Sequence, residues 1–396
     1  MKLIKHHQKN LLAKAKKMWP KNSISEATSN AFMATPRHRF VQRYRTFHSN
    51  QWHEITPDTL KDHLSTLYAD HPLALFGEDD ANIPSTISQP SLVLRMLDML
   101  QIEPGHQIFE LGAGSGWNAA LMGYLVGEKG QVHSLEIIPE VAQTAAENVA
   151  GMGIENVNIV AADGGDGYAA GAPYDRAIFT AGSFDLPRHF YEQMKEGGLL
   201  LIVIKNSGGG DCLFLLRKVN DHFESIDSHP CGFVPMRGKY EIDSLAPIEL
   251  EQLPNWNDLQ QQQLSKTPFW WGSKGMGVRM WATIGIRSFL DVSEPTFRIF
   301  KESGAADHDL SKQFFGLWNE HLGSLVIAKD ESLIAYGSHD SKDRLIGLLK
   351  EWIDLGMPST ANMKLHIYPI DVSLSAGEKQ WLVLRKESKF LWHLDD

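Results

Sequence analysis

The stretch that most constrains this fold is Gln107–Trp117, with the sequence Q-I-F-E-L-G-A-G-S-G-W. Its apolar start is typical of a buried strand, and Gly112, Gly114 and Gly116 follow at alternate positions. Asn118–Val126 is almost entirely apolar and long enough for a helix. A strand, a glycine turn and a helix form the first unit of a nucleotide-binding α/β fold, in which the turn brings the backbone close to a ligand.

The glycine spacing separates two kinds of nucleotide ligand. A dinucleotide fingerprint would place its third glycine at position 117, where this chain has Trp117. Glu110, at the end of the strand, suits a cationic ligand group better than a pyrophosphate. S-adenosylmethionine carries an ammonium and a sulfonium but no phosphate. The motif therefore favours S-adenosylmethionine, and Trp117 argues against a dehydrogenase.

Two more acidic residues follow the next predicted strands. Gln131–Leu135 ends at Glu136, about 20 residues after the last glycine, where an acidic side chain meets ribose hydroxyls. Asn158–Ala162 ends at Asp163, whose carboxylate would accept a hydrogen bond from an adenine amino group. Each of these acidic residues, taken alone, is more simply interpreted as a solvated loop residue. Three acids at successive strand ends indicate a nucleoside site.

A hydroxyl-rich segment, Ser85–Pro90, precedes a predicted helix at Leu92–Leu100. Hydroxyl groups and first-turn amides at a helix N-terminus are suited to binding an anion. The alternative is that Ser88 or Ser91 simply caps the helix, which is the commoner role of such residues.

Further strands are predicted along the middle of the chain. They lie at Tyr174–Thr180, Leu199–Ile204 and Cys212–Val219, with a turn at Glu196–Gly198. Strands that alternate with helices predict an α/β domain with a largely parallel sheet.

These segments together resemble the protein-L-isoaspartate O-methyltransferases, which methylate the carboxyl group of isomerised aspartate. The matching segments are T-P-R-H-R-F-V (35–41), T-I-S-Q-P (86–90), E-L-G-A-G-S-G-W (110–117), A-D-G-G-D-G (162–167), A-P-Y-D (172–175), F-T-A (179–181), E-G-G (196–198) and F-V-P-M-R-G (233–238). Many methyltransferases share the glycine motif. The first two segments are much more specific to this family.

The resemblance implies a fold, a cofactor and a set of site residues. The fold would be the Rossmann-like, seven-stranded sheet of class I methyltransferases with a reversed last hairpin. Ser88 would lie at the substrate carboxylate, beside Thr86, Ile87 and Gln89. The residues expected to line the S-adenosylmethionine site are Glu110, Gly112, Ala113, Gly114, Gly116, Glu136, Asp163, Gly164 and Thr180. No metal is implied, and the substrate would be an isoaspartyl or aspartyl residue of a protein or peptide.

The chain departs from the family pattern in three places. The segment between Val41 and Gly77 is longer than usual, and Ile204–Asn206 replaces the usual P-V-G. Residues 241–396 have no counterpart in the simple repair enzymes. The motif at Pro268–Gly272 and the tail are similar to extended members from peptide natural-product pathways, which methylate an aspartate that then closes to an aspartimide. General repair and a dedicated precursor peptide both stay open as substrates.

The predicted organisation has four parts. Residues 1–84 form a helical and loop region that packs on a methyltransferase domain at 85–242, and a linker at 243–267 leads to an α+β domain at 268–396. Residues 246–267 are interpreted as a linker or a poorly packed helix.

The C-terminal part shows its own local patterns. Strand-like runs are Met280–Phe289, Ser324–Ala328, Ser332–Tyr336, Leu365–Tyr368 and Trp381–Arg385, with a hairpin turn at Lys329–Glu331 and a helix at Asp343–Leu355. Its tryptophans are expected in the core. The alternative is that Phe269–Trp271 forms an exposed aromatic surface that recognises a peptide.

The composition limits the classes of partner that this protein is expected to bind. A formal net charge of −10 without an evident basic face argues against nucleic acid. No apolar run reaches the roughly 20 residues of a membrane span. The two cysteines are too few for a disulfide framework, which fits a cytoplasmic protein. An inactive cofactor-binding adaptor is a further hypothesis, disfavoured by the intact Ser88, Glu136 and Asp163. The oligomeric state stays open.

Overall fold

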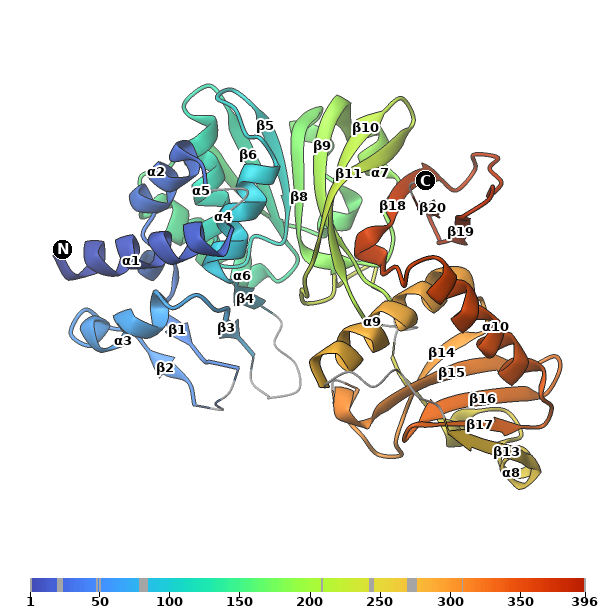
Figure 1. The fold of residues 1–396 in the computed structure, drawn as a ribbon. Coiled ribbons are helices and arrows are strands. Elements are labelled where there is room, and N and C mark those ends of the chain that lie inside the picture. The colour runs from blue at the N-terminus through green and yellow to red at the C-terminus, as the bar shows by residue number, and fades with distance from the viewer. Residues whose placement is uncertain are drawn as a thin grey trace. The chain divides into compact units, whose positions relative to one another are not determined.

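A computed structural model describes residues 2–19, 24–47, 49, 51–77, 85–207, 209–241, 246–268, 276–307 and 309–394, without the side chains of 276–282 and 310. The chain divides into two compact units (Figure 1). The first unit comprises Met1–Val203, Phe214–Asp227 and Phe233–Glu241, and the second comprises Ile204–Leu213, Ser228–Gly232 and Ile242–Asp396.

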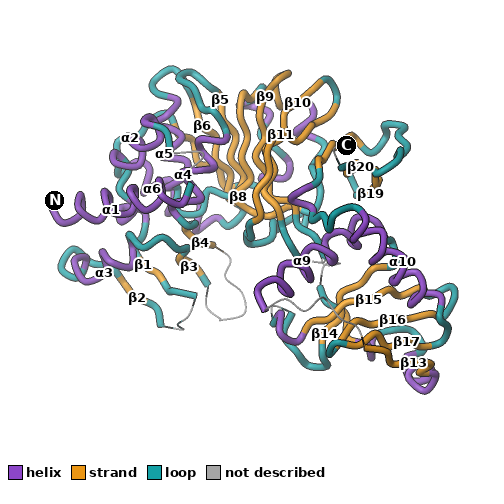
Figure 2. The backbone as a smooth tube through the Cα atoms, viewed as in Figure 1, coloured by secondary structure: helices purple, strands orange, loops and turns teal. Residues whose placement is uncertain are grey.

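The first unit is built on a sheet whose strands lie side by side in Figure 2. Among the described residues, the strands of this sheet that lie wholly or mainly in the first unit are β5 (Gln107–Leu111), β6 (Gln131–Glu136), β7 (Val157–Ala161), β8 (Tyr174–Ser183), β9 (Met194–Ile204), β10 (Cys212–Val219) and β11 (His222–Pro230). Their spatial order is β11-β10-β9-β8-β5-β6-β7. The four strands β5 to β8 are parallel, so their carboxyl ends share one edge. A two-residue turn joins the adjacent β10 and β11, which makes them an antiparallel hairpin.

Helices connect the parallel strands as the sequence predicts. They are α5 (Trp117–Val126), between β5 and β6, and α6 (Pro139–Ala150), between β6 and β7. Helix α4 (Pro90–Met99) precedes β5, and α7 (His189–Gln193) lies between β8 and β9. The expected turn at Glu196–Gly198 is wrong, because these residues continue β9. Gly197 accommodates a φ of +72° there at an exposed position, which only glycine adopts without strain.

The N-terminal residues form small elements around the glycine turn. These are α1 (Lys2–Met18), α2 (Glu26–Ala34), a 3-10 helix η1 (Arg37–Phe40), β1 (Arg43–Tyr44), β2 (His53–Glu54), α3 (Leu60–Leu67), β3 (Leu73–Phe76) and β4 (Ser85–Ile87). Helix α1 packs on α4, and α2 packs on both α4 and α5. Strands β3 and β4 pair antiparallel, which places the hydroxyl-rich segment in a short sheet directly before α4.

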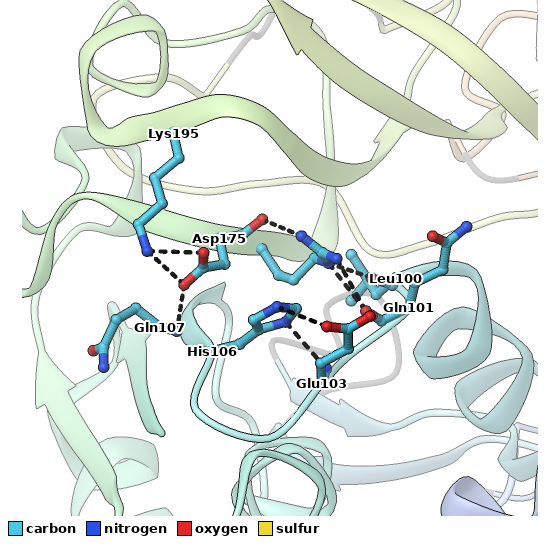
Figure 3. A network of polar contacts seen from close by, with 8 residues as sticks. Leu100, Gln101, Glu103, His106, Gln107, Asp175 and Lys195 are labelled. Atoms are coloured by element: carbon cyan, nitrogen blue, oxygen red, sulfur yellow. Dashed lines mark hydrogen bonds and ion pairs between the residues drawn. The ribbon is translucent and has the colours of Figure 1, made fainter. Parts of the chain in front are cut away.

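A polar network fixes the starts of the two central strands (Figure 3). The backbone N–H of Gln107, the first residue of β5, donates to the Asp175 carboxylate over 2.9 Å. Lys195 donates to both oxygens of the same carboxylate over 2.8 Å. Because Asp175 is at the start of β8, these contacts lock the register of β5 against β8. The opposite ends of the two strands, which carry the predicted site residues, are thereby held at a constant offset.

The second unit has its own six-stranded sheet in the order β12-β14-β15-β16-β17-β13, counted over the described residues. Its elements are β12 (Ile248–Glu249), α8 (Trp256–Leu259), β13 (Gln263–Pro268), α9 (Met276–Ser293), β14 (Phe297–Lys301), β15 (Gln313–Asn319), β16 (Ser324–Lys329), β17 (Ser332–Tyr336), α10 (Asp340–Asp354), β18 (Lys364–Pro369), β19 (Gln380–Leu384) and β20 (Ser388–His393). Helix α10 packs on β15 and β16. The predicted hairpin of β16 and β17 is confirmed.

Two expectations for this unit are wrong. Within the segment 246–267, which was interpreted as a linker or a poorly packed helix, residues 263–267 belong to a strand, since β13 pairs antiparallel with β17. Met280–Phe289 lies in the helix α9 rather than in a strand. Its bulky apolar residues are typical of strands, but Ile286, Phe289 and Leu290 are buried at helical spacing, so packing overrides local preference. The proposed aromatic surface at 269–271 lies outside the described residues.

Among the described residues, no helix combines the length and the apolar character needed to cross a membrane.

Candidate functional site

A cavity of the first unit opens at the carboxyl edge of its parallel strands. Its empty volume is about 930 Å³, including the part that is open to solvent. Five groups of residues contribute most of the wall: Ser85–Ser88, Glu110–Ser115, Glu136–Ile137, Asp163–Gly164 and Phe233–Arg237. Segments far apart in the sequence therefore meet at the position that the glycine motif indicates.

The glycine turn forms the floor of the cavity. Gly112 and Gly114 have φ values of +92° and +53°, which favour glycine. A Cβ atom at Gly112 would lie 2.6 Å from Thr180 Oγ1, and one at Gly114 would lie 3.3 Å from the carbonyl oxygen of Thr86. The turn is therefore closely packed between β8 and β4. Ala113 and Thr180 also line the cavity.

Glu136 lies at the end of β6 and supports the turn. One carboxylate oxygen accepts the N–H of Gly114 over 2.9 Å, and the other accepts the N–H of Ile138 over 3.2 Å. Burial raises the pKa of Glu136, while these amides and the charge of Arg237 lower it. A carboxylate has about four lone-pair sites, so each oxygen retains capacity for a ligand hydroxyl.

Glu110 lies beneath the turn and is fully buried. Asn118 Nδ2 donates to one of its oxygens over 2.7 Å, and Ser134 Oγ donates to the other over 2.5 Å. Burial raises the pKa of Glu110 to about 7. Glu110 lines the cavity, where a cationic ligand group was expected, and each of its oxygens already accepts one hydrogen bond. The side chain that these contacts leave unsatisfied is that of Asn118.

Asn118 is a site residue that the sequence analysis missed. It lines the cavity, and its Oδ1 atom is buried without a hydrogen-bond partner among the described residues. Because Nδ2 donates to Glu110, Oδ1 is the atom left to accept from a ligand. A signal was present in the sequence, since Asn118 is an amide at the start of an otherwise apolar helix.

Asp163 follows β7 and joins two walls of the cavity. Its carboxylate accepts the N–H of Gly165 and the N–H of Lys239, each over 2.9 Å. A Cβ atom at Gly238 would lie 2.3 Å from the carboxylate, so this glycine allows the close approach. The segment 233–238, which was quoted only for its resemblance, thus closes over the predicted nucleoside end. Gly164 lines the same end.

Ser88 lies in the cavity wall, between β4 and α4. Its hydroxyl makes no hydrogen bond to any residue that the structure describes. Both predicted caps are wrong, because Gln89 is the N-cap residue of α4 and no side chain caps the helix locally. The carboxylate of Asp70 takes that place, accepting the N–H of Ser91 over 2.9 Å. Ser88 is half-buried, so its hydroxyl remains accessible.

Two predicted site residues do not line the cavity. The Nε2 atom of Gln89 instead donates a hydrogen bond to the Asp70 carboxylate over 3.2 Å. Gly116 faces the next helix instead, where a Cβ atom would lie 2.9 Å from the carbonyl oxygen of Ala145. Its glycine is needed for the packing of α5 on α6. Thr86 and Ile87 do line the cavity.

Comparison with known proteins gives consistent similarities over the first unit. A family model described as protein-L-isoaspartate(D-aspartate) O-methyltransferase matches residues 6–241. Protein-L-isoaspartate O-methyltransferase 1 of Archaeoglobus fulgidus is 34% identical over 220 residues, which cover 55% of this chain and 88% of that relative. The protein-L-isoaspartate O-methyltransferase of Pyrococcus horikoshii is 34% identical over 218 residues, covering 54% of this chain and 87% of that relative.

One solved structure is similar in fold well beyond residue 241. It is named protein-L-isoaspartate O-methyltransferase, and it aligns with a TM-score of 0.53 and 23% identity over 91% of this chain and 96% of that chain. At this identity the similarity concerns the fold alone. That solved chain is therefore of about the same length as this one, and it carries the same name as the two relatives above.

Proposed function

Since this chain belongs to the protein-L-isoaspartate(D-aspartate) O-methyltransferase family, whose cofactor is S-adenosylmethionine, we propose that its cavity brings that cofactor to a substrate carboxylate held at Ser88. The observation that carries the proposal is Ser88, which lines the cavity and whose hydroxyl has no partner among the described residues. It faces the same cavity as the glycine turn and the strand-end acids. We assign the substrate as an isoaspartyl residue.

The residues present fit the cofactor along its length. Asp163 and Glu136 suit the adenine and the ribose, because carboxylates accept from amino and hydroxyl groups. The glycine turn lets a ligand approach the backbone where a side chain would collide with Thr180. At the remaining end, the unpaired Oδ1 of Asn118 suits the α-ammonium of the methionine part. Leaving that oxygen buried and unpaired costs about 1–3 kcal/mol, which a bound ammonium would recover.

This methyl transfer requires alignment of the substrate carboxylate with the methyl donor, and it does not require acid–base catalysis. When bound, the cofactor supplies a methyl group that its sulfonium already activates. A carboxylate is nucleophilic at neutral pH, so no side chain needs to remove a proton. The roles left to the protein are to orient the carboxylate through Ser88, to hold the cofactor on the glycine turn, and to exclude water. Holding the reacting atoms roughly 3 Å apart accounts for most of the lowering of the activation barrier.

The substrate class follows from the family and from the architecture together. An aspartyl residue of one dedicated precursor peptide is the alternative, suggested by the C-terminal unit. An extended chain also occurs in the solved structure named protein-L-isoaspartate O-methyltransferase, so the extension does not favour the alternative. A peptide-recognition role for residues 268–396 stays a prediction.

The cofactor assignment is tested by calorimetry on Asn118→Leu. S-adenosylhomocysteine carries the amino-acid part, whereas 5′-methylthioadenosine lacks it and serves as the control ligand. We expect the variant to bind S-adenosylhomocysteine about 10- to 150-fold more weakly, the loss of one hydrogen bond to a charged group, and to bind methylthioadenosine as the wild type does. An equal loss for both ligands would reject the role of Asn118.

The reaction assignment is tested by the chemistry of the product. An isoaspartyl peptide is incubated with the full-length chain and S-adenosylmethionine labelled in the methyl group. A carboxyl methyl ester releases labelled methanol in mild base, whereas an N-methyl product retains the label. We expect base-labile product. Stable labelling of the peptide would contradict carboxyl transfer.

A further inference from the structure

Arg37 is a buried cation outside the cavity wall. It lies in η1, is fully buried, and comes from the P-R-H segment of the sequence. Its guanidinium lies 5.6 Å from the ring centroid of Trp117. Burial lowers the pKa of Arg37 to about 9, which still leaves it protonated at neutral pH. A buried charge without bound partners is very costly, so its hydrogen bonds indicate what it does.

Among the described residues, the hydrogen-bond acceptors of Arg37 are all backbone carbonyl groups. Nη1 donates to Leu67, the last residue of α3, over 2.7 Å. Nη2 lies within hydrogen-bond distance of three carbonyls, those of His71, Ile87 and Ser88, at 3.1, 3.3 and 3.1 Å. The planar guanidinium therefore links the end of α3 to the backbone of residues 87 and 88, which belong to the hydroxyl-rich segment before α4.

A second group holds the other side of the same segment. The Asp70 carboxylate accepts the backbone N–H of Ser91 over 2.9 Å and the Gln89 side chain over 3.2 Å. Arg37 thus holds the carbonyls of 87 and 88, while Asp70 holds the residues 89 and 91. Ser88 lies between the two attachments and lines the cavity, and its hydroxyl has no hydrogen-bond partner among the described residues.

We propose that Arg37 is a positioning residue for methyl transfer, which acts by holding the Ser88 backbone through its carbonyl, with Asp70 as its counterpart on the helix side. The inference rests on the proposed role of Ser88. It assigns a function to the P-R-H segment that lies 51 residues earlier in the chain. Lysine cannot replace this arginine, because an ammonium lacks the fork that spans carbonyls on two segments.

The test compares Arg37→Lys with Arg39→Lys as a matched control. Arg39 is on the same short helix, and among the described residues its side chain makes one hydrogen bond, an exposed one to the carbonyl of Gly151. We expect Arg37→Lys to lower kcat for an isoaspartyl peptide about 10-fold or more, as misplacement of a substrate group does. The affinity for S-adenosylhomocysteine should change less than about 2-fold, and Arg39→Lys should behave as the wild type.

A double-mutant cycle with Ser88→Ala separates the two claims. If Arg37 acts through Ser88, Arg37→Lys changes kcat less than about 2-fold in the Ser88→Ala background. Fully additive effects, or an unchanged kcat in Arg37→Lys alone, would overturn the inference. Wild-type turnover in Ser88→Ala alone would instead overturn the proposed role of Ser88.

Amide hydrogen exchange gives a readout that needs no substrate. Arg37→Lys should speed exchange in the peptide that covers residues 85–92 by about 10-fold, relative to Arg39→Lys. Unchanged exchange would overturn the inference. If Arg37→Lys does not fold, the same measurements are made on Asp70→Asn. The same results are expected, because this substitution weakens the hydrogen bonds of Asp70 to residues 89 and 91.

Discussion

The indole N–H of Trp117 donates a hydrogen bond to the backbone carbonyl of Thr35 over 3.0 Å. The Trp117 ring is 1% exposed and meets Phe32 edge-on at 6.2 Å between ring centroids. The residue that excludes a dinucleotide fingerprint is therefore an anchor for the N-terminal helices. It attaches α2 to the helix that follows the glycine turn.

Replacing Trp117 by Phe should destabilise the chain. The buried Thr35 carbonyl would lose its donor, which costs about 1–3 kcal/mol. Urea unfolding followed by circular dichroism should show a lower midpoint for Trp117→Phe. Tyr124→Phe, at an exposed position of the same helix, is the control and should stay within about 0.5 kcal/mol of the wild type. Equal midpoints for both variants would contradict the anchoring role.

Replacing Ser88 by Ala should lower turnover without loss of cofactor. A hydrogen bond to a charged group contributes roughly 1.5–3 kcal/mol, so kcat should fall about 10- to 150-fold. The affinity for S-adenosylhomocysteine, measured by calorimetry, should not change. Ser65→Ala, at an exposed position of α3, serves as the control. Wild-type turnover in Ser88→Ala would reject the role of this hydroxyl.

Replacing Gly114 by Val should abolish cofactor binding. The new side chain would meet the Thr86 carbonyl, 3.3 Å from the Cβ position, at a φ of +53°. Gly127→Val isolates the backbone strain, because Gly127 has a φ of +62° and no atom within 4 Å of its Cβ position. Calorimetry should find no binding to Gly114→Val and normal binding to Gly127→Val. Normal binding to both would place the cofactor elsewhere.

Glu110 should make stability fall as the pH rises. Its pKa is raised to about 7 in the folded chain, so between about 4.5 and 7 the folded state holds a proton that the unfolded state has released. The stabilisation is therefore complete below the unfolded pKa and is lost as the pH approaches 7. The groups that face this carboxyl are Ser134 and Asn118, with the charge of Glu136 nearby.

Glu110→Gln isolates this contribution. The free energy of unfolding of the variant, relative to the wild type, should rise by on the order of 2 kcal/mol between pH 5 and pH 8. Urea unfolding of both proteins at each pH measures the difference. A constant difference over this range would contradict the assigned titration.

The glycine turn and its flanking strands could be predicted because their signals are local. Gln107–Leu111 is an apolar run before a glycine motif, and the structure has β5 at the same residues. The caps of α4 could not be predicted in this way, since the capping carboxylate of Asp70 is 21 residues before Ser91. Local hydroxyls are the common caps, and nothing at Ser88 or Ser91 indicates a distant one.

Roles that depend on contacts between distant segments were missed for the same reason. The position of Asn118 after the glycine motif was visible, but its unpaired oxygen depends on Glu110 being buried beneath it. In α9, apolar residues that favour strands are buried at helical spacing, which only the neighbouring elements decide. Sequence patterns thus placed the cavity, while tertiary contacts determined which atoms face it.

The most direct measurement of the central claim is methyl transfer to two matched peptides. They are identical except that one contains isoaspartate and the other normal aspartate, and both are incubated with the full-length chain and labelled S-adenosylmethionine. Our account predicts base-labile labelling of the isoaspartyl peptide, little labelling of the aspartyl peptide, and a large loss of both in Ser88→Ala. Equal labelling of the two peptides, or preference for normal aspartate, would contradict it and favour a dedicated aspartyl substrate.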